Sequence, residues 1–385
     1  MTDAGTIFTV LLVATGLPYL YLIITYSYGW FRLREYQSPE PSREMRTPVT
    51  IIVPARNEEK TIGNLLEDLL RQDYPDRHTE IIVVDDSSED KTAEVVAKIM
   101  EENEQKKIRL LTIKEEHPDA PYKKKAIALA ISRSSGRLIV TTDADCEMGP
   151  HWLSSLVFLY EKEGPRMILG PVSYHRERSF FEKMQTLEFL SLIAITAGAI
   201  RIGKPIMCNG ANLAYEKEAW LSAGGFGEDR FSSGDDVFLL LKIRKQFGPR
   251  SIRFLKSREA LVYTRPQKKP ADFLNQRVRW ASKNKGYDLQ ILIVSFTVYL
   301  MNLLMVAGFL LAIWLPALLP VMVVAYLAKL AAELPVLFGI SGFVRRKSVI
   351  LYAAPLLVLY PLYIVVTAAL GILGKYRWKD RKIKN

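Results

Sequence analysis

The apolar positions of this chain fall into two kinds of segment. Long uninterrupted apolar runs lie near both ends, from about Ile7 to Phe31 and again from Leu289 onwards. Between them, short β-branched runs alternate with segments of helical period. A run of about 20 apolar residues can cross a hydrocarbon core of roughly 30 Å at 1.5 Å per residue. The pattern predicts a water-facing domain held between membrane-spanning helices.

The first apolar run predicts a retained membrane anchor over residues 1–31. A cleavable signal peptide is the alternative, and it would need a basic N-terminal region and a small-residue cleavage site. The only early charge is Asp3, whereas Arg32 and Arg34 follow the run directly. Because cytoplasmic flanks carry the excess of Lys and Arg, these charges place the next segment in the cytosol.

Three further apolar segments follow in residues 289–374, namely Leu289–Trp314, Val321–Ile340 and Val349–Leu373. Lys329 and Glu333 lie four residues apart in the second, so they can pair on one helix face. In lipid they should face protein or the interface. Four crossings would put the basic tail, residues 375–385, outside, against the charge rule. Either the Val321 segment lies in the interface or one apolar region is re-entrant.

The middle domain, residues 32–288, alternates strand and helix patterns. Its expected strands are Val49–Val53, Ile81–Val84, Ile108–Ile113 and Leu138–Thr142. Helical spacing marks the segments between them, Thr61–Leu70, Thr92–Met100 and Lys125–Ser132. Continuous apolar strands separated by helices indicate a mostly parallel sheet covered by helices on both faces. The expected fold class is therefore α/β, with transmembrane α-helices at both ends.

The net charge of +11 does not point to a nucleic-acid partner. Residues 289–385 hold ten Lys/Arg and two Asp/Glu, so most of the surplus lies beside the apolar segments. There it is typical of contact with anionic membrane lipids. The two cysteines, Cys146 and Cys208, provide neither a disulfide framework nor zinc-ligand spacing.

Polar residues follow three of the expected strands. The first strand ends in Pro54–Glu59, the second in Asp85-Asp86-Ser87, and the fourth in Asp143-Ala144-Asp145. Parallel sheets bind ligands at the carboxyl ends of their strands. Helix capping is the alternative for Asp86 and Ser87, and a simple turn is the alternative for the last group. Two carboxylates at i and i+2 can instead meet Mg²⁺ or Mn²⁺ together with phosphate oxygens.

Two later elements carry further candidate chemistry. Gly234-Asp235-Asp236 leads into a helical pattern, where capping is again the alternative. The stretch Gln276–Trp280 falls in an amphipathic helix just before the second apolar region, where a basic and aromatic membrane belt is the alternative. The apolar stretch Phe180–Ile200 has basic ends and reads either as an interfacial helix presenting an acceptor or as an ordinary buried helix.

These residues together resemble the inverting glycosyltransferases of family 2, which have a GT-A fold. The resemblance is to the membrane-bound branch that includes hyaluronan, chitin and cellulose synthases and ceramide glucosyltransferase. It covers about residues 48–288 and rests on four elements in order: Pro54–Glu58 with Asp86, Asp143-Ala144-Asp145, Gly234-Asp235-Asp236, and Gln276-x-x-Arg279-Trp280. Ser87 and Lys124 stand where the family often has Gly, and Asp235 replaces the Glu of cellulose synthases.

The resemblance implies a nucleotide-sugar donor, favouring UDP, and a role for each matching residue. The expected donor-binding residues are Pro54, Glu58, Asp86, Lys125, Asp143, Gln276, Arg279 and Trp280. Asp145 would hold Mg²⁺ or Mn²⁺, and Asp236 would be the catalytic base. Asn209, Gly210 and Asp235 would lie on the acceptor side.

The implied function is transfer of a sugar to a hydroxyl of a lipid-linked or saccharide acceptor. A processive polysaccharide synthase is the alternative within the enzyme class. A membrane sugar-binding or scaffold protein with this fold is the non-enzyme alternative, and a transporter fits poorly because it would show internal repeats and more spans. The expected location is a bacterial cell (inner) membrane, with the catalytic domain in the cytoplasm.

Overall fold

The computed structural model describes residues 3–37, 45–113, 122–227, 234–372, 375–378 and 381–384. The chain packs into two compact units, each assembled from separated stretches. We call them the helical unit (residues 1–32, 178–202 and 267–375) and the sheet unit (residues 33–177, 203–266 and 376–385). Residues 178–202 and 267–288, within the domain expected to face water, thus pack with the apolar helices.

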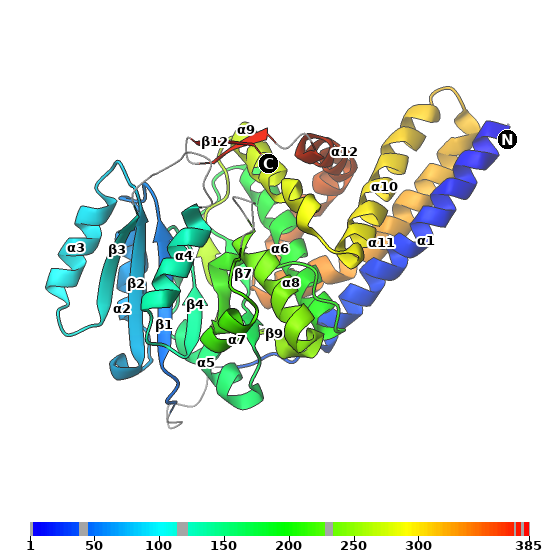
Figure 1. Ribbon diagram of the computed structural model, residues 1–385. Helices are drawn as coiled ribbons and strands as arrows, with labels where there is room; N and C mark the ends of the chain where they lie inside the picture. The colour runs from blue at the N-terminus through cyan, green and yellow to red at the C-terminus, as the bar shows by residue number, and fades with distance from the viewer. Residues whose placement is uncertain are drawn as a thin grey trace. The chain divides into compact units, whose positions relative to one another are not determined.

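The sheet unit contains a mixed seven-stranded sheet in the order β3-β2-β1-β4-β8-β6-β9 (Figure 1). Its first four strands are parallel, whereas β8 runs antiparallel to both of its neighbours. The strands are β1 Val49–Ala55, β2 Thr79–Asp86, β3 Ile108–Ile113, β4 Leu138–Thr141, β6 Met167–Leu169, β8 Leu213–Glu216 and β9 Ile252–Phe254. The four strands expected from the sequence are thereby confirmed as the parallel part.

Helices connect the parallel strands. The sheet unit contains α2 Ile62–Leu70, η1 Asp76–His78, α3 Thr92–Glu102, α4 Tyr122–Arg133, α5 Trp152–Glu163, η2 Gly210–Asn212, α7 Lys217–Ser222, α8 Asp235–Phe247 and η3 Pro249–Ser251. The chain adds β2 and β3 on one side of β1 and then β4 on its other side. Right-handed crossovers therefore place α2 and α3 on one face of the sheet and α4 on the other. Ile62, Leu65 and Leu66 on α2 are fully buried, as their spacing predicts.

The sheet unit also contains a second, three-stranded sheet. It has the order β5-β10-β7, with β5 Glu147–Met148, β10 Val262–Thr264 and β7 Val172–Tyr174. β10 pairs parallel with β7 and antiparallel with β5. These strands have only two or three residues, too few to show a periodic pattern in the sequence.

The helical unit contains the apolar helices. Its elements are α1 Asp3–Arg32, α6 Phe180–Arg201, α9 Pro270–Ala281, η4 Ser282–Gly286, α10 Leu289–Leu311, η5 Pro316–Leu318, α11 Leu319–Phe343, η6 Lys347–Tyr352 and α12 Ala353–Ile372. Among the described residues, four helical segments are long and apolar enough to cross a membrane: 3–32, 289–311, 316–343 and 347–372. In Figure 1, α1, α10 and α11 run side by side. The expected basic tail includes two short paired strands, β11 Lys375–Trp378 and β12 Arg381–Lys384; residues 379, 380 and 385 lie outside the described part.

The ionisable residues of α11 form the pair that their spacing predicts. Lys329 is 2% exposed, and its Nζ lies 2.6 Å from Glu333 Oε1. The Tyr19 hydroxyl of α1 donates to the same carboxylate. The aromatic rings of Tyr19 and Tyr360 also flank the ammonium group. The pair therefore faces protein, as expected for charged groups within an apolar helix bundle.

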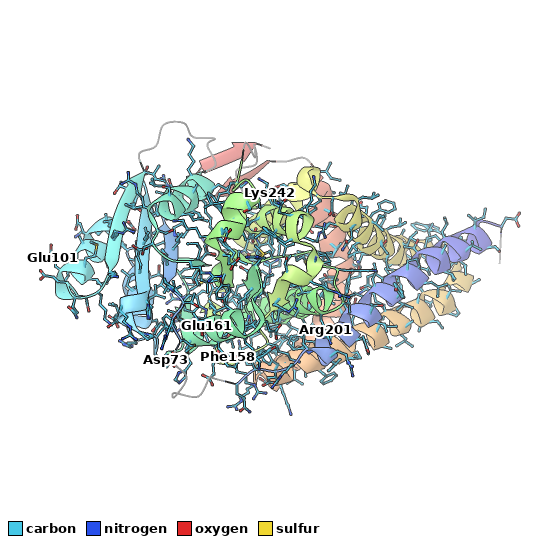
Figure 2. All side chains as sticks on the ribbon, turned by 60° about the horizontal axis from the view of Figure 1, so that its bottom comes forward. Asp73, Glu101, Phe158, Glu161, Arg201 and Lys242 are labelled. Atoms are coloured by element: carbon cyan, nitrogen blue, oxygen red, sulfur yellow. The ribbon has the colours of Figure 1, made fainter. Side chains whose placement is uncertain are left out.

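The helix α6 is a buried helix rather than an exposed interfacial one. Most of its side chains are buried, and Ser179 and Glu182 form a capping box at its start. Its backbone meets that of α1 at two glycines: a Cβ atom added to Gly198 would lie 2.0 Å from the Tyr26 carbonyl oxygen. One added to Gly29 would lie 2.3 Å from the Gly198 carbonyl oxygen. At the end of α6, Arg201, labelled in Figure 2, donates from Nε to the Arg32 carbonyl.

Candidate functional site

The carboxyl ends of β1, β2 and β4 lie at one edge of the sheet. These strands are parallel neighbours in the order β2-β1-β4, so the residues that follow them emerge on the same side. After β1 the chain adds β2 and β3 on one side of it and then β4 on the other side. The strand order therefore reverses at β1, which makes this edge a topological switch point. Asp86 and Asp143 follow strands two places apart, roughly 10 Å at ~4.8 Å per strand.

The loops after β1 and β2 lock together around a buried arginine that the sequence analysis did not single out. Arg56 is 5% exposed, and its Nη1 donates to the carbonyls of Asp86 (2.8 Å) and Ser87 (2.9 Å). Asn57 completes the lock, since its amide donates to Ser88 Oγ (3.0 Å) and its side-chain oxygen accepts from the Glu89 amide (2.8 Å). The sequence signal for both residues was their position in the polar stretch that directly follows the first strand.

The buried carboxylate of Asp86 is not a helix cap. The cap position of α3 is Lys91, five residues further on, and Asp90 accepts from the Thr92 amide there (3.0 Å). Ser87 adopts φ +53°, a left-handed conformation that glycine reaches at lower cost, which is consistent with the glycine that the resemblance leads one to expect here. Nearby, Glu58 accepts from the Thr61 hydroxyl (2.7 Å), so its carboxylate supports the start of α2.

The Asp143–Asp145 segment forms a turn whose carboxylates contact other elements. The Cys146 amide donates to the Asp143 carbonyl (3.1 Å), so the turn expected as the simpler alternative is present. The Asp143 carboxylate also lies 2.8 Å from Lys123 Nζ. Asp145 accepts from the Thr264 hydroxyl of β10 at 3.1 Å. Both carboxylates are half-buried, so the turn presents two acidic groups at the sheet edge.

Asp235 and Asp236 lie in the first turn of α8. Gly234 precedes them at φ +90°, a conformation that favours glycine. One oxygen of Asp236 accepts from the Val237 amide (2.7 Å), a contact within the helix start. Its other oxygen accepts from the Gly210 amide (3.2 Å), which belongs to a distant part of the sequence. The Asp236 carboxylate is thus fixed in orientation by two backbone donors.

In the 209–212 segment, Gly210 lies beside the charged residues of the candidate site. A Cβ atom at Gly210 would lie 3.6 Å from Asp235 Oδ2 and 3.7 Å from Lys123 Nζ, so this backbone borders both charges. Asn209 accepts from the Ala211 amide (3.0 Å).

The neighbouring Asn212 has a structural role, since it is fully buried and donates to the carbonyls of Pro171 and Ala260, both at 2.8 Å. Lys242, labelled on α8 in Figure 2, donates to Gly225 and lies outside this group.

Lys123 links the two acidic groups. Its Nζ lies 2.8 Å from Asp143 and 3.8 Å from Asp235. Burial alone would lower the pKa of Lys123, but attraction to Asp143, Asp235 and Asp236 raises it above its ordinary value, so the ammonium stays charged. The group connects the end of β4 with the start of α8.

Lys125 is the expected donor-binding lysine, whereas Lys123, two residues earlier, is the one that contacts both acidic groups. Lys125 is exposed, and Lys124 is buried with its Nζ 5.0 Å from the Phe238 ring centre. Successive residues of a helix point about 100° apart, so only one of three can face a given group. The helix boundary needed to choose between them is not visible in a run of identical residues.

The acidic edge fits a divalent cation bound together with phosphates. Among the residues that the structure describes, no three His, Cys, Asp or Glu side chains are grouped as a protein-only metal site. Mg²⁺ and similar ions bind through one or two carboxylates when substrate phosphates supply other ligands. The half-buried Asp143 and Asp145 carboxylates, two residues apart on one turn, match that donor set.

The last sequence element, Gln276–Trp280, lies on α9 in the helical unit. Gln276 accepts from Arg277 Nη1 (2.6 Å), and the Trp280 ring centre lies 6.1 Å from that of Phe189 on α6. Arg277 is 3% exposed and pairs with Glu188. The membrane-belt alternative fails for Arg277, because a belt residue would have its charge in the interface rather than in a buried pair.

The fold is that of GT-A glycosyltransferases. A mannosyltransferase from Pyrobaculum calidifontis, solved in complex with GDP-Man and Mn²⁺, matches with a TM-score of 0.58 at 19% identity. The match covers 95% of this chain and 99% of that one. The chain belongs to the family 2 glycosyltransferases: the profile of glycosyl transferase family group 2 matches residues 138–370, and that of glycosyl transferase family 2 matches residues 50–220.

Curated relatives match parts of this chain. A beta-monoglucosyldiacylglycerol synthase from Trichormus variabilis is 25% identical over 51% of this chain and 42% of its own length. An undecaprenyl-phosphate 4-deoxy-4-formamido-L-arabinose transferase from Yersinia enterocolitica is 34% identical over 35% of this chain and 39% of its own length. The chain therefore spans less than half the length of these two relatives.

Proposed function

We propose that this protein transfers a sugar from a nucleotide-sugar, UDP-linked by family resemblance, to a hydroxyl of a lipid-linked or saccharide acceptor, with inversion at the anomeric carbon. The observation that carries the proposal is the Lys123 contact. It joins Asp143, at the end of a central strand, to Asp235, beside the candidate base Asp236. Groups suited to a diphosphate and to a hydroxyl thus meet at one sheet edge.

The donor would bind along the carboxyl ends of β2, β1 and β4. Asp86 is suited to the donor base, with Pro54 and Glu58 lining the nucleotide pocket. Asp143 is suited to the ribose and diphosphate, and Asp145 to Mg²⁺ or Mn²⁺. The Pyrobaculum mannosyltransferase, whose title names GDP-Man and Mn²⁺, supports a divalent cation and a nucleotide-sugar. A bound cation would neutralise charge on the leaving diphosphate.

The remaining chemistry falls to side chains of this chain. The bond between the anomeric carbon and the diphosphate oxygen breaks as the sugar becomes oxocarbenium-like, a transition state shared with glycoside hydrolysis. The Lys123 ammonium can stabilise the negative charge that develops on the departing diphosphate. The Asp236 carboxylate, held by the Gly210 and Val237 amides, accepts the proton of the attacking hydroxyl. Gln276, Arg279 and Trp280 would act on the diphosphate and the acceptor.

A lipid-linked acceptor at the cytoplasmic face of a bacterial cell membrane suits this chain best. The two relatives described above are named for a diacylglycerol product and an undecaprenyl-phosphate substrate. The chain itself has four helical segments that could cross a membrane. Arg32 and Arg34 follow directly after the first of them, and by the positive-inside rule they support a cytoplasmic position for the residues that come next.

Neutralising Lys123 tests which lysine serves the diphosphate. Lys123→Met should lower kcat/KM by about 10²-fold, because it removes a cation beside the reacting groups. Lys125→Met is the matched change at an exposed neighbour and should alter kcat/KM by less than about threefold. Steady-state transfer rates with purified protein measure both. A larger loss for Lys125→Met than for Lys123→Met would return the role to Lys125.

The whole proposal is tested by a release assay. Purified full-length protein in lipid nanodiscs is given UDP-glucose, UDP-N-acetylglucosamine or GDP-mannose with bacterial lipid extract and Mn²⁺, and free nucleotide and products are measured. Lipid-dependent release, with one sugar added to a lipid by mass spectrometry, is expected. Long products would establish a processive synthase instead. Donor binding without release would make the protein a sugar-binding scaffold.

A further inference from the structure

Arg277 on α9 lies between two aromatic rings of its own helix. Phe273 is four residues before it and Trp280 three residues after it, so both are its neighbours on one helix face. The guanidinium carbon lies 4.5 Å from the Phe273 ring centre and 4.2 Å from the Trp280 ring centre. These distances are within the range of favourable cation–π contact.

The same guanidinium forms a buried ion pair with α6. Its Nε lies 3.3 Å from Glu188 Oε1, and its Nη2 bonds to Glu188 Oε2, a two-point contact between groups that are each 3% exposed. Tyr363 of α12 donates to Glu188 Oε1 at 3.3 Å. Its ring centre lies 5.5 Å from that of Phe273. Arg277 is therefore held by two other helices of the bundle.

The guanidinium of Arg277 also contacts two neighbours in the Gln276–Trp280 element. Nη1 donates to Gln276 Oε1 at 2.6 Å, which turns that side-chain amide and leaves its NH₂ group to donate elsewhere. The planar face of the guanidinium covers one side of the Trp280 ring, and Phe189 approaches the ring from α6. One buried cation thus sets the orientation of an amide and of an indole.

We infer that Arg277 is a positioning residue for sugar transfer, holding Trp280 and Gln276 in the geometry that receives the acceptor. The inference rests on the proposed function, because it needs those two side chains to touch substrate. It goes beyond that function by assigning the positioning of these acceptor-binding side chains to a buried ion pair, Arg277 with Glu188. The pair also makes the acceptor-binding geometry depend on how α6, α9 and α12 pack.

The chemistry of arginine makes Arg277→Lys the sharpest variant. Lysine keeps the positive charge facing Glu188, so no buried carboxylate is left without a counter-charge. It loses the planar group that covers Trp280 and the fork that reaches Gln276 and Glu188 together. Phe273→Leu is the gentler second variant, since it removes one aromatic face and leaves the ion pair intact.

The experiment compares these variants with wild type in full-length protein reconstituted in nanodiscs. UDP binding with Mn²⁺ is measured by calorimetry, and transfer is measured with the active nucleotide-sugar while the bacterial lipid extract is titrated. For Arg277→Lys we expect UDP affinity within about threefold of wild type, because the diphosphate keeps its charged partners Lys123, Arg279 and the Mn²⁺ ion, and the displaced Gln276 and Trp280 act mainly on the acceptor. We expect kcat/KM for the extract, counted per UDP-binding site, to fall by about 10- to 100-fold, since small misplacement of a positioning group costs that much.

Two further measurements separate positioning from mere stability. Phe273→Leu should lower the same kcat/KM about three- to tenfold, mainly through KM for the extract. Arg71→Lys, the same substitution at an exposed ion pair of α2 and its end, should change neither quantity. The swap Glu188→Arg with Arg277→Glu should restore folded yield without restoring transfer, because a glutamate cannot stack on Trp280.

The outcomes that overturn the inference are distinct from those that overturn the function. Wild-type kcat/KM in Arg277→Lys, or a loss that disappears when counted per UDP-binding site, shows a structural role only. If Arg277→Lys yields no folded protein, wild-type kcat/KM in Phe273→Leu overturns the inference. Full transfer in the swapped pair does so as well. A wild-type protein that releases no nucleotide overturns the proposed function and the inference together.

Discussion

Replacing Asp236 by Asn is expected to lower turnover by about 10²- to 10⁴-fold while UDP binding stays within about threefold of wild type. General-base catalysis typically contributes a factor of that size. An amide of nearly the same shape can still accept one of the two backbone bonds, from Gly210 or Val237, but it cannot take a proton from the acceptor hydroxyl. The measurement is single-turnover transfer with donor-saturated protein.

Asp76→Asn is the matched control, because its carboxylate is 59% exposed and pairs only across the surface with Lys106. It should leave turnover unchanged. Preserved turnover in Asp236→Asn would remove this residue from the base role. Asp235, which shares the helix start and contacts Lys123 at 3.8 Å, would then be the next candidate.

Replacing Asp145 by Ala is expected to weaken Mn²⁺-dependent UDP binding by about 10²-fold and to abolish transfer at ordinary Mn²⁺ concentrations. The residue would supply one of the few protein oxygens to the cation, and loss even of groups that only orient such ligands typically costs 10- to 100-fold. Chelation of the metal in wild-type protein should reproduce the loss of binding. Calorimetric titration of UDP at several Mn²⁺ concentrations measures the effect.

Thr264→Val is a milder test of the Asp145 contribution to Mn²⁺ binding, since it removes only the hydroxyl that donates to Asp145 at 3.1 Å. Its loss of Mn²⁺ affinity should be smaller than that of Asp145→Ala. An Asp145→Ala protein with the wild-type Mn²⁺ dependence would show that the cation is held elsewhere or is not needed.

The parallel half of the sheet was predictable because its strands are continuous apolar runs bounded by helices of clear period. Burial on both faces leaves that signature in the sequence. The strands β6, β7, β9 and β10 were not predictable, because each has only three residues, too few for a period. Helix α6 was ambiguous for a related reason, since a helix buried on most sides shows little amphipathic contrast.

The candidate site was predictable where charge follows a strand and not where it lies within a helix. Asp86, Asp143 and Asp145 stand directly after apolar runs, and parallel pairing alone brings those ends together. Lys123 required the helix phase, which identical neighbours conceal. Arg56 and Arg277 required knowledge of tertiary partners, because a buried arginine is recognised by the groups that satisfy it.

The close approach of Gly29 and Gly198 makes the N-terminal helix more than a tether. Without α1, the α6 backbone around Gly198 would lose the helix that packs directly against it. A shortened chain beginning after residue 32 should therefore aggregate rather than yield a soluble enzyme. For expression work, the protein is best kept whole, with any affinity tag added ahead of the first helix and never in its place.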